Sequence, residues 1–138
     1  MNTLLDAELE PEIIARIWCS IFQEDERMTA LLRRLKGRYR TFILSDTDPL
    51  HWDWLNRNYG VEEWATGNIL SFRQVRMKAD PGAFAEIIRS FCLPAANTVF
   101  VDDLEKNIAA AEAAGLRGVL HKGYEETLKS LEANGVMV

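Results

Sequence analysis

The chain has 138 residues, enough for one domain with its own hydrophobic core. Hydrophobic residues make up 48% and charged residues 27% of the sequence, which is typical of an ordinary globular protein and excludes a disordered or fibrous one. The formal net charge of −5 opposes non-specific attraction to nucleic acid and to anionic lipid, so we expect neither partner.

Targeting signals and cysteine motifs are not found in the sequence. No apolar run approaches the ~20 residues that span a bilayer, and residues 1–10 are acidic without the basic and apolar regions of a signal peptide. We therefore expect no membrane partner and a cytoplasmic location. Cys19 and Cys92 form no C-x-x-C motif, and no histidine stands at metal-ligand spacing, so neither a disulfide framework nor a zinc site is predicted. Both thiols are expected to be buried on apolar helical faces.

Apolar residues at helical spacing predict two helices at the start of the chain. The residues that carry this periodicity are Ile14, Ile17 and Ile21 in the first helix and Met28, Leu31, Leu32 and Leu35 in the second. The expected division is a helical segment over residues 1–36 and a core domain over residues 37–138, which together form a single globular unit.

Strand and helix patterns alternate through the rest of the chain. Apolar runs predict strands over residues 40–44, 68–70, 98–101 and 118–120, and helices are predicted over 49–58, 81–92, 104–114 and 124–133. Asp48 and Asp80 each precede a proline and are expected to be N-caps, the helix at 49–58 is expected to end at Gly60, and Gly115 is expected to be a C-cap. The alternation predicts an α/β fold in which helices flank a parallel sheet.

Polar residues stand at three places beside these predicted strands, where ligands of open parallel sheets bind. Ser45 follows the first strand, Lys78 precedes the helix at 81–92, and Asp102-Asp103 follows the strand at 98–101. A hydroxyl, an ammonium and two carboxylates are the groups that phosphoryl transfer needs, because they supply hydrogen-bond donors, positive charge and hard oxygen ligands for Mg²⁺.

The adjacent carboxylates of Asp102 and Asp103 are unfavourable for stability alone, because two such charges repel by about 1–4 kcal/mol at ~4 Å. We interpret them as metal ligands, and the alternative is a solvated pair that caps the following helix. Asn107 lies one turn after Asp103, so its amide is expected to face the same point as the Asp103 side chain. The alternative is an exposed helix amide.

Three segments together resemble motifs two, three and four of the haloacid dehalogenase superfamily, in order and at familiar separations. They are FILSDTD at residues 42–48, Lys78, and VFVDDLEKNI at residues 99–108. The likeness covers about residues 40–122 and includes AAAEAAGLRGVL at residues 109–120, which looks like the family's helix, glycine turn and next strand. The resemblance implies a Rossmann-like fold that hydrolyses phosphate esters, or less often carbon–halogen bonds, through an aspartyl intermediate, with Mg²⁺ in the phosphatases.

The same resemblance implies roles for individual residues. It implies a catalytic and phosphate-binding set of Ser45, Asp46 and Lys78. It implies a metal set of Asp103, which would bind Mg²⁺, and of Asp102 and Asn107, which would support it. Ser45 would hold a phosphoryl oxygen, and Lys78 would neutralise the nucleophile and the phosphate. Residues 11–36 look like the end of the helical cap that selects the substrate in one branch of the family.

The sequence departs from the family pattern at motif one, an apolar strand that ends in Asp-x-Asp and has no counterpart before Ser45. In the family this strand lies in the middle of the sheet. We therefore expect a gap between the strands at 40–44 and 98–101, closed by direct pairing, by another segment or by a second chain. The gap and the aromatic helix at 49–58 favour a homodimer.

Residues 44–48 can themselves be interpreted as a strand followed by Asp-x-Asp, with Asp46 as the nucleophile and Asp48 as the general acid. This alternative leaves no hydroxyl residue at the right distance for motif two, because Ser71 lies only seven residues before Lys78. Two functions stay open. The first is a Mg²⁺-dependent phosphohydrolase of small phosphorylated metabolites that is incomplete in this chain, and the second is a catalytically inactive phosphate-binding or dimerisation module.

Overall fold

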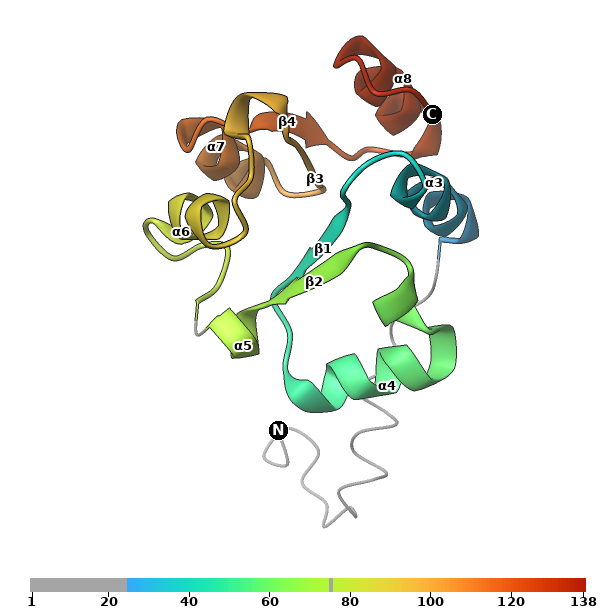
Figure 1. Ribbon diagram of the computed structural model, residues 1–138, viewed down its shortest axis with the longest axis vertical. Coiled ribbons are helices and arrows are strands. Elements are labelled where there is room, and N and C mark those ends of the chain that lie inside the picture. The colour runs from blue at the N-terminus through green and yellow to red at the C-terminus, as the bar shows by residue number, and fades with distance from the viewer. Residues whose placement is uncertain (1–24, 75) are drawn as a thin grey trace.

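The computed structural model describes residues 25–74 and 76–138 (Figure 1). The predicted first helix and Cys19 lie outside the described residues. In chain order the elements are α3 (Glu26–Lys36), β1 (Phe42–Ser45), α4 (Pro49–Tyr59), the 3-10 turn η1 (Val61–Glu63), β2 (Gly67–Leu70), α5 (Ser71–Gln74), α6 (Ala83–Ser90), the 3-10 turn η2 (Ala95–Asn97), β3 (Val99–Asp102), α7 (Glu105–Ala113), β4 (Arg117–Leu120) and α8 (Tyr124–Ala133).

The four strands form two parallel pairs. β1 pairs with β2 up to the register Ser45↔Leu70, and β3 pairs with β4 up to Asp102↔Leu120. Within the described part of the chain, β1 and β3 are not hydrogen-bonded to each other. The expected gap between these two strands is therefore confirmed, and its closure by direct pairing is wrong. Closure by another segment or by a second chain stays a prediction.

Large apolar side chains fill the core between the β1–β2 pair and α4. The buried residues are Trp52, Val61 and Leu70, and the partly buried residues around them are Ile43, Leu55, Tyr59, Trp64 and Phe72. A fully buried side chain of this size stabilises a fold by about 1.5–3 kcal/mol relative to its exposed state. Trp52, which exposes 5% of its surface, therefore contributes mainly to the core of the protein, and Trp54 packs edge-on against Tyr59 with ring centroids 5.9 Å apart.

Alanines and the edge-on Phe84–Phe100 pair pack α6 and α7 against the β3–β4 pair. The buried residues are Phe84, Ala111 and Leu116, and the partly buried residues around them are Leu44, Ile88, Ala95, Phe100, Ala110 and Ala114. Because Leu44 belongs to β1, this cluster also connects the two strand pairs. A Cβ on Gly118 of β4 would lie 2.5 Å from Ile108 Cγ2, so α7 can approach β4 this closely only above a glycine.

The predicted ends of α4 are confirmed. The Asp48 carboxylate accepts the His51 N–H at 2.9 Å, and Pro49 occupies the first turn. Gly60 ends the helix in the left-handed conformation with φ +65°. These caps satisfy backbone groups that a helix terminus leaves without partners.

The start and end of α6 differ from the sequence prediction. The Asp80 carboxylate accepts the Met77 N–H at 2.7 Å and thus stabilises the turn over residues 77–80. The α6 helix begins only after Gly82. The predicted N-cap at Asp80 is therefore wrong. Cys92 is also not a buried helical thiol: it is exposed, with φ 51°, after α6 has ended. The Leu93 N–H bonds the Ile88 carbonyl across this residue at 2.9 Å, which is the bond of a Schellman helix end.

The α3 helix lies near α8 and contacts it through Arg27 (Figure 1). The Arg27 guanidinium of α3 lies 4.7 Å from the ring centroid of Tyr124 in α8. The division of the chain at residue 36 stays a prediction. No helix in the described ranges is both long and apolar enough to span a bilayer.

Candidate active site

The polar residues predicted to form a site lie at the carboxyl ends of β1 and β3. Ser45 is the last residue of β1, and Asp46 follows it in the loop before α4. Asp102 is the last residue of β3, and Lys78 lies in the loop between α5 and α6. The structure thus brings together groups that are far apart in the sequence.

Lys78 and Asp102 form the central ion pair of this site. The Lys78 Nζ lies 2.8 Å from Asp102 Oδ2, and the two side chains expose only 16% and 6% of their surface. The other carboxylate oxygen, Asp102 Oδ1, accepts the Leu104 N–H at 2.8 Å and the Asn107 side-chain amide at 3.2 Å. A charge-assisted pair with this little solvent holds both side chains in a defined position.

The surroundings of Asp102 fix its charge. Burial by itself would raise the pKa of Asp102, but the hydrogen bonds from Lys78, from the Leu104 N–H and from Asn107, and the positive charge of Lys78, favour the carboxylate more strongly. The pKa of Asp102 is therefore lowered from its ordinary value of 3.8. Asp102 is ionised at neutral pH and balances the charge of the Lys78 ammonium.

Asp46 holds the backbone of Lys78. Its Oδ1 accepts the Lys78 N–H at 2.9 Å. Lys78 is therefore fixed at two points, at its amide by Asp46 and at its ammonium by Asp102. The half-buried Ser45 makes no side-chain hydrogen bond to another described residue, so its hydroxyl is available to a ligand at the strand end.

Asp103 differs from its neighbour Asp102, because it is exposed and makes no hydrogen bond or ion pair within the described ranges. Asn107 is buried and contacts Asp102, whereas the sequence predicted that it would face Asp103. The alternative, a solvated pair that caps the following helix, fits only in part. Asp102 accepts the N–H of Leu104, the N-cap residue of α7, but its side chain exposes only 6% of its surface beside Lys78.

The carboxylates of the acidic pair are oxygen ligands of the kind that Mg²⁺ takes. Residues 25–74 and 76–138 contain no cluster of three or more His, Cys, Asp or Glu side chains suited to a metal ion. Magnesium commonly takes one or two protein carboxylates and completes its shell with water and substrate phosphate oxygens. The unengaged carboxylate of Asp103, beside a second carboxylate that can accept one more bond on Oδ2, fits such a site.

Ser71 also lies in this region, and it is not among the site residues that the sequence predicts. It is buried, directly follows β2, and its Oγ accepts the Thr47 N–H at 2.9 Å and donates to the Thr47 carbonyl at 2.9 Å. The signal that could have found it is the one that selected Ser45, a polar residue immediately after an apolar strand.

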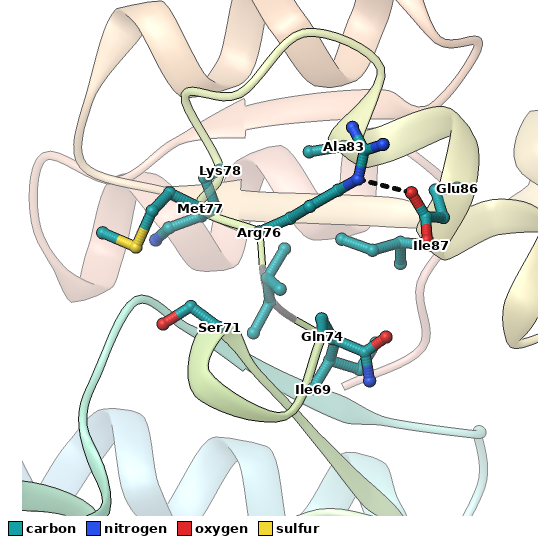
Figure 2. A pocket seen from close by; sticks show the side chains of 10 residues that line it. Ile69, Ser71, Gln74, Arg76, Met77, Lys78, Ala83, Glu86 and Ile87 are labelled. Atoms are coloured by element: carbon teal, nitrogen blue, oxygen red, sulfur yellow. Dashed lines mark ion pairs between the residues drawn. The ribbon is translucent and has the colours of Figure 1, made fainter.

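A small hollow lies beside Lys78, between the β1–β2 pair and α6 (Figure 2). Apolar residues that line it include Leu44, Ile69, Ala83 and Ile87. Figure 2 shows Ser71 on one side of the hollow and Lys78 on the other, with the Arg76–Glu86 ion pair, 2.6 Å long, beside them. The hollow therefore joins an apolar surface to the polar groups of the strand ends.

The sequence matches a family model. The model describes a haloacid dehalogenase-like hydrolase and matches residues 3–115. A curated sesquiterpene phosphatase of Aspergillus oryzae is 29% identical over 104 residues, which cover 69% of this chain and 49% of that protein. The chain thus spans about half the length of this relative.

Solved structures share the fold. An aspartate-to-alanine variant of a HAD family enzyme from Bacteroides thetaiotaomicron, in complex with magnesium and inorganic phosphate, has a TM-score of 0.79 at 23% identity, over 88% of this chain and 66% of that one. A predicted HAD-like hydrolase of Porphyromonas gingivalis has a TM-score of 0.79 at 20% identity, over 96% and 68%. The expected Rossmann-like α/β fold is confirmed. Because the family model matches most of its length, the chain belongs to the haloacid dehalogenase-like hydrolase family.

Proposed function

We propose that this hydrolase is a Mg²⁺-dependent phosphohydrolase acting on a small phosphorylated metabolite. The observation that carries the proposal is the Lys78–Asp102 ion pair, 2.8 Å long, at the same end of the strands as Ser45, Asp46 and Asp103. The phosphatase relative and the phosphate bound to the Bacteroides enzyme support phosphate as the recognised group.

The chain's own residues suit a phosphate group. An ammonium has three N–H donors, and Lys78 uses one of them on Asp102, which leaves donors for phosphoryl oxygens. The Ser45 hydroxyl would donate to another phosphoryl oxygen. Both groups would stabilise negative charge that develops on the phosphoryl oxygens during transfer, and the Lys78 ammonium is already oriented by Asp102 before the reaction.

Asp103 would hold Mg²⁺, with Asp102 and Asn107 supporting it. The bound metal would polarise phosphoryl oxygens and balance their charge. Asp102 would then lie beside two cations, the Lys78 ammonium on its Oδ2 and the metal. Asn107 holds the Asp102 carboxylate in place through Oδ1.

The proposed reaction passes through an aspartyl phosphate. A carboxylate oxygen attacks phosphorus, the ester oxygen leaves and takes a proton, and water then hydrolyses the acyl phosphate. We propose that the attacking carboxylate comes from a segment other than the described residues. Within those residues the Asp-x-Asp sequence is Asp46-Thr47-Asp48, and both of its carboxylates already accept backbone N–H groups.

Turnover of para-nitrophenyl phosphate with Mg²⁺ tests the proposal. We expect the wild type, together with the segment that supplies the nucleophile, to exceed a protein-free blank, and we expect Lys78→Met and Asp103→Asn to lower kcat/KM by about 100-fold or more, as loss of a charge-stabilising group does. Asp53→Asn is the matched control, because Asp53 is an exposed carboxylate paired with Arg57 on α4. Absence of activity in the wild type with that segment present would overturn the enzyme proposal and favour the inactive phosphate-binding module.

Asp46→Asn separates the two candidate sources of the nucleophile. An asparagine keeps an oxygen that can accept the Lys78 N–H, so the loop should keep its conformation. Under the proposal this variant retains part of its turnover. Complete loss of turnover, with Mg²⁺ binding by calorimetry unchanged, would instead support Asp46 as the nucleophile and Asp48 as the general acid.

We also propose a homodimer. Leu50 on α4 exposes 55% of its surface, and the facing edges of β1 and β3 are not paired with each other in the described ranges. Exposed apolar residues and free strand edges favour association. Sedimentation at micromolar concentration should show a dimer, and a monomer would contradict the proposal.

A further inference from the structure

The backbone ladder between β1 and β2 ends just before the candidate site. The last paired residues are Ser45 and Leu70, after which β2 turns directly into α5. Thr47, two residues beyond the end of β1, makes no backbone hydrogen bond to β2 in the described ranges. Its amide and carbonyl bond instead to one side chain, the Ser71 hydroxyl, with both distances 2.9 Å.

A hydroxyl is suited to this task because it donates one hydrogen bond and accepts others. Ser71 exposes 7% of its surface, so water cannot easily replace it. An alanine would satisfy neither Thr47 group, and an aspartate would satisfy the amide alone. Threonine would keep both functions, and cysteine would keep the shape but form weak hydrogen bonds.

The loop that Ser71 holds is the loop that holds Lys78. Asp46, adjacent to Thr47, accepts the Lys78 N–H at 2.9 Å. The Lys78 ammonium then reaches Asp102 at 2.8 Å. A continuous series of contacts thus runs from the end of β2, through the 45–48 loop and Lys78, to the end of β3. It crosses between two strand pairs that share no backbone ladder in the described ranges.

We propose that Ser71 is a positioning residue for the active site. By fixing Thr47 it holds Asp46 against the Lys78 amide, and it thereby sets the place of the Lys78 ammonium and of the Ser45 hydroxyl. This inference rests on the proposed function for its catalytic meaning. Its structural part, the connection from Ser71 to Lys78, can be tested without turnover.

Amide hydrogen exchange of the full chain, resolved by NMR, tests the connection. We expect Ser71→Ala to accelerate exchange at both the Thr47 and the Lys78 amides by about tenfold or more, and Ser71→Thr to restore both. Ser71→Cys, which keeps the side-chain volume, should act like Ser71→Ala and replaces it if the alanine variant does not fold. Thr98→Val is the matched control, because it also removes a hydroxyl bonded to a backbone carbonyl, that of Pro94 at 2.9 Å, at the opposite end of β3. We expect it to change neither amide.

Acceleration at Thr47 with wild-type exchange at Lys78 would overturn the inference, because it would confine the effect of Ser71 to its own loop. Equal acceleration in Thr98→Val would also overturn it, since the effect would then be general loss of stability.

The functional arm uses inorganic phosphate with Mg²⁺ as the probe, measured by calorimetry, and para-nitrophenyl phosphate as the substrate. We expect Ser71→Ala to weaken phosphate binding and to lower kcat by about tenfold each, with recovery in Ser71→Thr. A wild type that binds phosphate without turnover counts against the proposed function alone. Unchanged phosphate binding and kcat in Ser71→Ala, with both amides accelerated, would overturn the positioning role of Ser71.

Discussion

The two strand pairs are packed in opposite ways. In the first, which we term the aromatic half (β1, α4, β2), large side chains such as Trp52 and Trp64 fill the space between helix and strands. In the second, the alanine half (β3, α7, β4), Ala111 and its neighbours let the helix approach Gly118 closely. The groups of the candidate site lie where the halves meet, with Asp46 on one side and Asp102 on the other. The aromatic half should therefore be sensitive to lost volume and the alanine half to added volume.

The largest effect should come from removing volume in the aromatic half. Trp52→Ala would leave a cavity beside Val61 and Leu70 and remove the hydrogen bond from Trp52 Nε1 to Glu62. We expect unfolding free energy to fall by about 3–5 kcal/mol. Trp52→Phe, which keeps most of the volume, should lose clearly less. Equal losses in urea titrations of both variants would show that packing does not dominate this half.

The next largest effect should come from the contact between the halves. Asp102→Asn leaves the Lys78 ammonium without its counter-charge, and we expect a loss of about 2–4 kcal/mol at pH 7. Because the pKa of folded Asp102 is lowered, the stabilisation is present above the ordinary pKa and disappears as pH falls through the folded pKa. The difference between wild type and Asp102→Asn in urea titrations should thus shrink below pH ~4. A difference that stays constant down to pH ~2 would contradict the role of the carboxylate charge.

A smaller effect should come from adding volume to the alanine half. In Gly118→Ala the new Cβ would meet Ile108 Cγ2 at 2.5 Å and Glu112 Oε1 at 2.8 Å. The Glu112 carboxylate can move away but the Ile108 methyl lies on the packed helix, so we expect a loss of about 1–3 kcal/mol by thermal unfolding. Gly37→Ala is the control, since Gly37 has φ −72° and its nearest contact would be 3.4 Å away. Equal Tm shifts in the two variants would contradict the close approach of α7 to β4.

The smallest effect should come from Asp48→Asn. Asparagine caps helices as well as aspartate does, so the His51 N–H keeps an acceptor and stability should change by less than about 0.5 kcal/mol. Turnover should also be unchanged if Asp48 is only a cap. Loss of turnover in a variant with wild-type Tm would identify Asp48 as the general acid.

Most elements could be predicted from the sequence because their signals are local. Hydrophobic periodicity and the Asp48 and Gly60 caps place α4, and the α8 prediction coincides with its observed range. Asp80 does not cap α6, because its carboxylate accepts the N–H of Met77, three residues earlier in the chain, at 2.7 Å. Residue spacing alone does not show which N–H group a carboxylate accepts.

The site was predictable as a location but not as a set of contacts. Parallel strands bring their carboxyl ends together, so a polar residue after each strand identifies the edge. Which partner each residue contacts depends on how helices sit on the strands: α7 directs Asn107 to Asp102 and not to Asp103. The role of Ser71 follows from the register of β1 with β2, which the sequence does not contain.

The uneven distribution of aromatic residues makes the halves distinguishable by spectroscopy. Trp52, Trp54 and Trp64 lie in the aromatic half, whereas residues 83–138 contain no tryptophan, and Trp18 lies outside the described residues. In a Trp18→Phe background, tryptophan emission would report the unfolding of one half, while far-UV circular dichroism would report helices of both. Coincident transitions would mean that the halves unfold as one cooperative unit. Separate transitions would mean that the polar contacts and Leu44 packing between them transmit little stability.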